Sequence, residues 1–247
     1  MWLWPHLLSL DAPLVAVAWS ALLARSLQMS VQPAVLLILA LTVWVIYAAD
    51  RLLDVRTHLP ATSRHLFART HRFGFGVSIW AALSLAGGLS AQILHPDIFW
   101  RGVCVALGVA LYMVAVHWGP LPRMGPRGKQ FAVSVLFAAG VVLPFHTARG
   151  IGIAWAVSAA VVWLNIYAIE EWESGQSRPT AVVAVSSISI GGTCFLLGGV
   201  NEYYRALALA ALLIFGLNWN RARLSSDLLR TAVDAVLFAP ALAILLR

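Results

Sequence analysis

The sequence holds few groups that can do acid–base or metal chemistry, and half of its carboxylates fall in two short clusters. Of the ten Asp and Glu residues, Asp50 and Asp54 form the first cluster, and Glu170, Glu171 and Glu173 form the second. Asp50 and Asp54 stand four residues apart, so on a helix both carboxylates project from one face. Glu170 and Glu173 share a face in the same way. If the two clusters face each other across a cavity, their oxygens form a site for Mg²⁺, which completes its shell with waters and substrate phosphates.

The two clusters end similar segments. The residues IYAAD at 46–50 resemble IYAIE at 166–170, and Val-Trp pairs precede both. This match predicts an internal repeat in which two copies of a four-helix unit each contribute one cluster. Internal repeats in membrane proteins often place the functional site at their interface.

Basic residues flank the clusters and could bind an anionic substrate. The segment 51–72 carries five arginines, Arg64 and Arg72 among them, and the Pro- and Gly-rich segment 120–129 carries Arg127 and the single lysine, Lys129. Arg presents a planar fork to phosphate oxygens, and Lys presents a compact charge. These residue types predict a diphosphate held by metal and cations together, with Tyr167 as a possible lining residue of the pocket.

Simpler interpretations remain open for the same residues. Asp50 can pair with Arg51 or another neighbour, and both clusters can be solvated helix ends. The arginines can serve only to hold the loops at anionic lipid head groups. Asp54 and His58 are four residues apart, which also allows a mixed carboxylate–imidazole metal site.

The composition shows what kind of element must position these residues. The 247 residues are 61% hydrophobic and 11% charged, with a mean hydropathy of +0.83. A soluble domain averages about 45–50% apolar and about 25% charged residues. The composition therefore excludes a water-soluble enzyme, a disordered chain and a secreted disulfide scaffold. Cys104 and Cys194 both lie in apolar runs, so we expect small core residues and neither a redox pair nor a zinc site.

Apolar runs of about 20 residues predict membrane-spanning helices. The chain contains nine candidates, so we expect an all-α polytopic membrane protein with a single transmembrane domain at 1–247. No signal peptide is evident at the start. The candidates are 12–29, 33–49, 73–92, 98–117, 131–145, 151–169, 180–200, 204–219 and 228–246.

The distribution of basic residues predicts the orientation. Of the 17 Lys and Arg residues, 12 follow the even-numbered spans and 5 lie on the other side. Because an excess of Lys and Arg marks cytoplasmic loops, the N-terminus is expected inside and the C-terminus outside. Both carboxylate clusters then face the cytoplasm, and we expect the chain in a bacterial inner membrane.

Acidic ends on the second and sixth of nine helices resemble the UbiA-type superfamily of intramembrane prenyltransferases. The first motif of that family is Asn-Asp-x-x-Asp-x-x-x-Asp. Asp50 and Asp54 match its last two acids, whereas Ile46 and Tyr47 stand at its Asn and first Asp. The second motif is Asp-rich and often follows Tyr-Ala. Here Tyr167 and Ala168 precede glutamates instead. Basic residues before the fifth helix, present in the family, correspond to Arg127 and Lys129. The chain is thus similar to a divergent member.

The resemblance implies Mg²⁺-dependent transfer of an isoprenyl group from a prenyl diphosphate to an aromatic or lipophilic acceptor. Asp50, Asp54 and the glutamate cluster would hold the metal, and Arg127, Lys129 and either Arg64 or Arg72 would neutralise the leaving diphosphate. Two alternatives stay open: a terpene cyclase of the same superfamily, and a non-catalytic lipid- or quinone-binding protein that has kept the fold. The absent Asn-Asp pair favours the second alternative.

Overall fold

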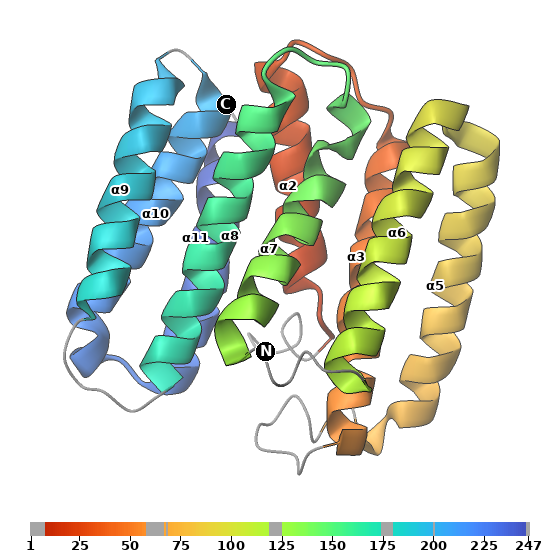
Figure 1. Ribbon diagram of the computed structural model, residues 1–247, viewed down its shortest axis with the longest axis horizontal. Helices are drawn as coiled ribbons and strands as arrows, with labels where there is room; N and C mark the ends of the chain where they lie inside the picture. Colours follow the sequence, from red (N-terminus) through yellow and green to blue (C-terminus); the bar gives the residue numbers. More distant parts are fainter. Residues whose placement is uncertain are drawn as a thin grey trace. The chain divides into compact units, whose positions relative to one another are not determined.

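A computed structural model describes residues 8–57, 67, 69–118, 125–173, 180–199 and 201–245. In this part of the chain the structure is helical, with nine α-helices of 16 to 25 residues and two short 3₁₀ turns (Figure 1). Each predicted apolar range falls on one of the nine helices. The helices are α2 (Asp11–Ser26), α3 (Pro33–Thr57), α5 (Arg72–Ile93), α6 (Pro96–His117), α7 (Gly125–Val142), α8 (Ile151–Glu173), α9 (Ala181–Gly198), α10 (Glu202–Asn220) and α11 (Ser226–Leu245), and the turns are η2 (Leu143–Phe145) and η3 (Arg221–Arg223).

Five of these helices are long and apolar enough to cross a membrane, which supports an all-α membrane protein. Shorter apolar stretches lie at Ala181–Leu197 and Thr231–Leu242. By length and composition, the described helices therefore support five of the nine predicted spans. The other four spans stay a prediction. The five candidate spans are Pro33–Asp54, Arg72–Ile93, Pro96–His117, Arg127–Phe145 and Ile151–Trp172.

The helix α6 illustrates why these helices suit a lipid environment. It is strongly apolar, yet none of its residues is buried when backbone and side chain are taken together, although the side chain of its last residue, His117, is itself buried. Trp100 is 64% exposed and Leu111 is 70% exposed. Apolar patches of this extent are rare on soluble monomers and mark membrane or partner contacts. Pro96 at the first turn of the helix and a surface ion pair between Arg101 and Asp97 favour its start at this point.

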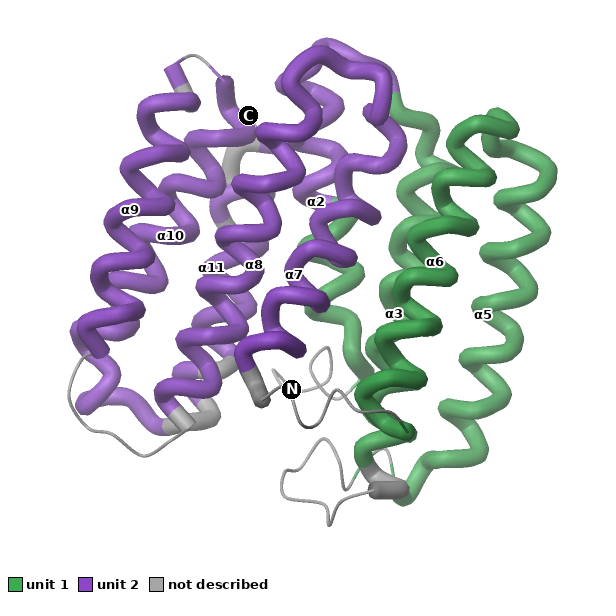
Figure 2. Tube along the Cα trace, in the orientation of Figure 1, with its two compact units in different colours: residues 1–17, 31–125 green, residues 18–30, 126–247 purple. Residues whose placement is uncertain are grey.

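The chain divides into two compact units (Figure 2). Unit 1 comprises residues 1–17 and 31–125, and unit 2 comprises residues 18–30 and 126–247. The division at 125 falls between the fourth and fifth predicted spans, where the two copies of the proposed repeat would meet. The second half of α2 belongs to unit 2, and the repeat itself stays a prediction.

In unit 1, α3 packs against α5 and α6. Trp44 of α3 stacks on Phe75 of α5, with ring centroids 6.5 Å apart, and its indole N–H donates to the carbonyl of Leu8 over 2.8 Å. The helix α5 runs in the opposite direction to α3, and α6 runs in the same direction as α3. The last turns of α3 and α6 therefore lie at the same end of unit 1 (Figure 1).

In unit 2, α10 packs against α8, α9 and α11 and carries much of the core. Ala211 and Ile214 of α10 are fully buried among Leu164 of α8, Val183 of α9 and Val233 of α11. Van der Waals packing of this kind stabilises helix association where lipid replaces water.

Two glycines of unit 2 lie at informative positions, one where α9 contacts α10 and one in the turn before α8. A β-carbon at Gly191 of α9 would lie 3.4 Å from the Leu212 side chain of α10, which is an ordinary van der Waals contact, so α9 and α10 are in contact at this position. The helix α7 ends just before Pro144, and the turn into α8 passes through Gly150 with a φ of +77°, which glycine adopts readily.

Candidate functional site

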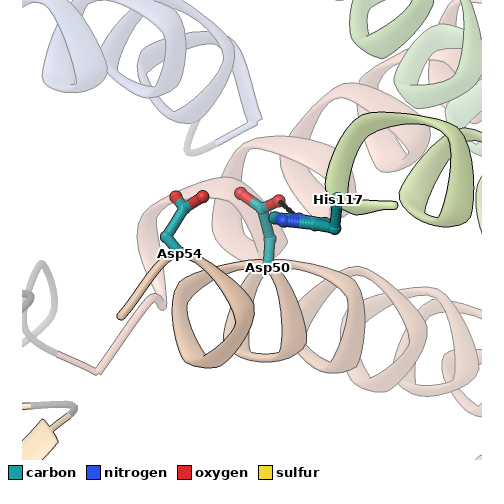
Figure 3. Close-up of side chains that lie close together, drawn as sticks. All are labelled: Asp50, Asp54 and His117. Atoms are coloured by element: carbon teal, nitrogen blue, oxygen red, sulfur yellow. Dashed lines mark hydrogen bonds and ion pairs between the residues drawn. The ribbon is translucent and has the colours of Figure 1, made fainter. Parts of the chain in front are cut away.

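The first carboxylate cluster meets a histidine that lies far from it in the sequence. Asp50 and Asp54 project from successive turns on one face of α3, and His117 reaches Asp50 from the last residue of α6 (Figure 3). The Nε2 atom of His117 lies 3.3 Å from Oδ1 of Asp50. One potential ligand atom from each of the three side chains lies within 4.8 Å of the others, which is compact enough for a single cation.

The position of this cluster along the helices matches its chemistry. Asp54 is the last residue of the candidate span Pro33–Asp54, and His117 is the last residue of Pro96–His117. Ionisable groups are costly at membrane depth, but at a span end they can exchange ions with water. The Asp50 side chain is 42% exposed, whereas the His117 side chain is only 4% exposed. The cluster thus combines an accessible carboxylate with a buried imidazole.

His117 is the functional candidate that the sequence analysis missed. The simpler alternative to a metal-binding role pairs Asp50 with Arg51 or another neighbour, and the structure adds a contact with a residue 67 positions away. The available signal was weak: His117 ends the fourth predicted span, and the predicted orientation places that end on the same side as Asp50. His58, the alternative ligand, lies outside the described residues.

The second cluster is held by polar groups of unit 2. Gln130, a buried residue in the second turn of α7, donates its side-chain amide to Glu170. The hydroxyl of Tyr167 donates to Glu171 over 3.2 Å. Arg127, at the start of the candidate span Arg127–Phe145, acts electrostatically on Tyr167 as well. The structure therefore brings four predicted site residues together at one end of unit 2.

A further polar network lies at the same end of unit 2. Arg221 of η3 is 4% exposed and donates from Nη1 to Oγ1 of Thr180 over 3.0 Å. Burial lowers the pKa of its guanidinium, and the negative charge of Glu171 opposes this effect. An Arg side chain remains charged at any physiological pH. Arg221 is therefore a buried cation that acts on the second cluster. From the sequence alone, Arg221 is only one of the basic residues that follow the even-numbered spans.

Asn218 connects this network to the core, which gives a test of its structural importance. Its side chain accepts from the Trp172 indole over 3.2 Å and donates to the Thr180 carbonyl over 3.1 Å. The substitution Asn218→Ala removes the acceptor of the Trp172 indole and of the Thr180 backbone N–H, so we expect a loss of about 2–3 kcal/mol in unfolding free energy. Thermal unfolding in mild detergent measures it.

The matched control is Asn220→Ala, which removes an exposed amide that donates to the carbonyl of Gly216 one turn earlier. We expect its stability to stay within about 0.5 kcal/mol of the wild type. Equal losses at both positions would contradict a special role for the Asn218 network.

The remaining predicted site residues are less constrained. Lys129 is half-buried on α7, and Arg72 is exposed at the first residue of α5. Arg64 lies outside the described residues, as does the side chain of Glu173. Asp50 and Asp54 belong to unit 1, whereas the glutamates, Arg127 and Lys129 belong to unit 2. The predicted cavity between the two clusters therefore stays a prediction.

Comparisons with known proteins add no identification. No family model matches the sequence, and neither a curated protein nor a solved structure matches it. The similarity to the UbiA-type superfamily consequently rests on the residues of the two acidic helix ends and on the predicted order of the spans.

Proposed function

We propose that this protein is a metal-dependent intramembrane prenyltransferase, which moves an isoprenyl group from a prenyl diphosphate to a lipophilic acceptor. The observation that carries the proposal is the gathering of Asp50, Asp54 and His117 within 4.8 Å at the ends of two apolar helices. A site at this depth suits an amphipathic substrate whose diphosphate lies in water and whose hydrocarbon lies among apolar helices.

The side chains at this site fit a divalent cation. Two carboxylates one turn apart repel each other, and a shared cation converts this repulsion into attraction. Three ligand atoms leave positions open for water and for phosphate oxygens. Asp50 and Asp54 would hold the cation, expected from the resemblance to be Mg²⁺, and the cation would supply positive charge that neutralises the departing diphosphate.

The side chains of unit 2 have a separate task in the proposal. Arg127 and Lys129 are the cations of unit 2 that the resemblance assigns to a diphosphate, and the positive charge of Arg221 acts on Glu171. When the bond between the prenyl C1 and the diphosphate oxygen breaks, the electron pair leaves with the diphosphate. A nucleophilic atom of the acceptor bonds to the allylic cation and then loses a proton. Apolar side chains exclude the water that would otherwise capture the cation.

The proposal is tested by product analysis with the purified protein in lipid nanodiscs. Prenyl diphosphates of several lengths are incubated with Mg²⁺ and with lipophilic phenols or quinols, and products are identified by mass spectrometry. We expect an adduct whose mass is the acceptor plus the prenyl group less one hydrogen. Cyclic hydrocarbons or alcohols formed without an acceptor would instead indicate a terpene cyclase. Unchanged substrate under every condition would contradict both enzymatic functions.

A further inference from the structure

The ligand set at the end of α3 is not purely oxygen. His117 contributes an imidazole nitrogen, and its side chain is 4% exposed, so the residues around it restrict its position. Asp50 and Asp54 contribute oxygens from the neighbouring helix (Figure 3). The three side chains thus present one nitrogen and two oxygens from two elements of the same unit.

The geometry favours metal coordination over a simple ion pair. The distance from Nε2 of His117 to Oδ1 of Asp50 is 3.3 Å. Charge-assisted N–H···O bonds are typically about 2.7–2.9 Å long. The His117 contact is therefore longer than the best pairs, and a second carboxylate lies within 4.8 Å of both atoms. Ligand atoms that surround one cation stand at such separations, because each contacts the ion and not the others.

Imidazole nitrogen discriminates among divalent cations. Mg²⁺ prefers carboxylates, carbonyls and water, and binds imidazole poorly, whereas Fe²⁺, Co²⁺ and Zn²⁺ accept imidazole readily. A purely carboxylate site would discriminate less strongly between Mg²⁺ and these cations. A buried imidazole in the ligand set favours Fe²⁺, Co²⁺ and Zn²⁺ over Mg²⁺.

We infer that His117 is a metal ligand and that this site selects a transition-metal dication of the Fe²⁺, Co²⁺ and Zn²⁺ class over Mg²⁺. The inference rests on the proposed function, since the open coordination positions are assigned to the diphosphate. His117 binds as a neutral imidazole through the lone pair of Nε2, with its proton on Nδ1. Asp50 and Asp54 complete the protein ligands.

Cobalt is the probe that tests this selection without any turnover. Metal-free full-length protein in mild detergent is titrated with Co²⁺, followed by its visible absorption, and then with Mg²⁺ as competitor. We expect one Co²⁺ per chain, bound at least about 10-fold more tightly than Mg²⁺. A paramagnetically shifted, exchangeable imidazole N–H proton in the NMR spectrum reports direct coordination by histidine.

Substitutions separate the ligand from its surroundings. His117→Ala should lower Co²⁺ affinity at least about 10-fold and remove the shifted proton, while Mg²⁺ affinity changes less than about 3-fold. His117→Gln gives the same result with less disturbance of packing, and thermal unfolding verifies that each variant folds. The control His95→Asn, at the exposed N-cap of the same helix, keeps the cap and should leave both affinities unchanged.

Each possible result either supports or overturns the inference that His117 is a metal ligand. Equal Co²⁺ and Mg²⁺ affinities, a missing shifted proton in the wild type, or full Co²⁺ affinity in folded His117→Gln would overturn the inference. The last result would leave the His117–Asp50 contact as a hydrogen bond only. Failure of the proposed function looks different: Co²⁺ binds through His117, but no prenyl diphosphate is consumed with any metal. Turnover that depends on Mg²⁺ and is unaffected by His117→Gln would support the function and reject the inference.

Discussion

Substituting Asp50 by Asn is expected to lower metal-dependent release of diphosphate by roughly 100-fold or more, and Asp54→Asn should do the same. Asn keeps the size of the side chain and a carbonyl oxygen, but it removes the negative charge. Because the Asp50 side chain is 42% exposed, the fold does not depend on burying that charge. Release of diphosphate from a labelled prenyl diphosphate measures the effect.

The matched control for these variants is Asp97→Asn on α6. Asp97 is also a carboxylate of unit 1, but it forms an exposed pair with Arg101 four residues later. We expect its turnover to remain within about 2-fold of the wild type, because exposed pairs contribute little. Wild-type rates in both Asp50→Asn and Asp54→Asn would reject a metal-binding role for the first cluster.

Replacing Arg221 by Ala should destabilise the protein by about 2–3 kcal/mol. The Arg221 side chain is buried and donates a charge-assisted hydrogen bond to Thr180. Its positive charge also attracts the carboxylate of Glu171. Its removal leaves the Thr180 hydroxyl and the carboxylate without this partner. Thermal unfolding, followed by the fluorescence of the tryptophans in mild detergent, measures the loss.

A control stands two residues further along the same turn. Arg223 is exposed, so Arg223→Ala removes an equal charge from the same η3 turn without emptying a buried position. We expect a change within about 0.5 kcal/mol. If both arginines contributed equally, Arg221 would be ordinary loop charge that favours the cytoplasmic side, and the network around Glu171 would have no structural role.

Hydrophobicity alone located the helices but not their ends. The helix α3 continues to Thr57, past the predicted end at 49, and α7 begins at Gly125, ahead of the predicted start at 131. Apolar runs define what lies in the membrane, whereas a helix continues through Asp, Arg and Leu because these residues tolerate helical geometry. For this reason Asp50, Asp54 and Glu170 lie on regular helix and not in loops.

The candidate site could be predicted only in part. The i, i+4 spacing of Asp50 and Asp54 is local, so sequence periodicity revealed their shared face. The partners that the structure adds, His117 for Asp50 and Gln130 for Glu170, are 67 and 40 residues away in the chain. Such contacts follow from helix packing, and no local pattern encodes them. The charge of Arg221 was visible in the sequence, but its burial was not.

The most direct test of the proposed prenyl transfer measures the release of pyrophosphate from the substrate. Purified wild-type protein in lipid nanodiscs is incubated with a prenyl diphosphate and a lipophilic acceptor, and ³¹P NMR distinguishes the diphosphate ester from free pyrophosphate. The account predicts that pyrophosphate appears when a divalent metal is supplied, and that chelation or Asp50→Asn stops its release. An ester that stays intact with every metal and chain length, or pyrophosphate release that continues after chelation, would contradict it.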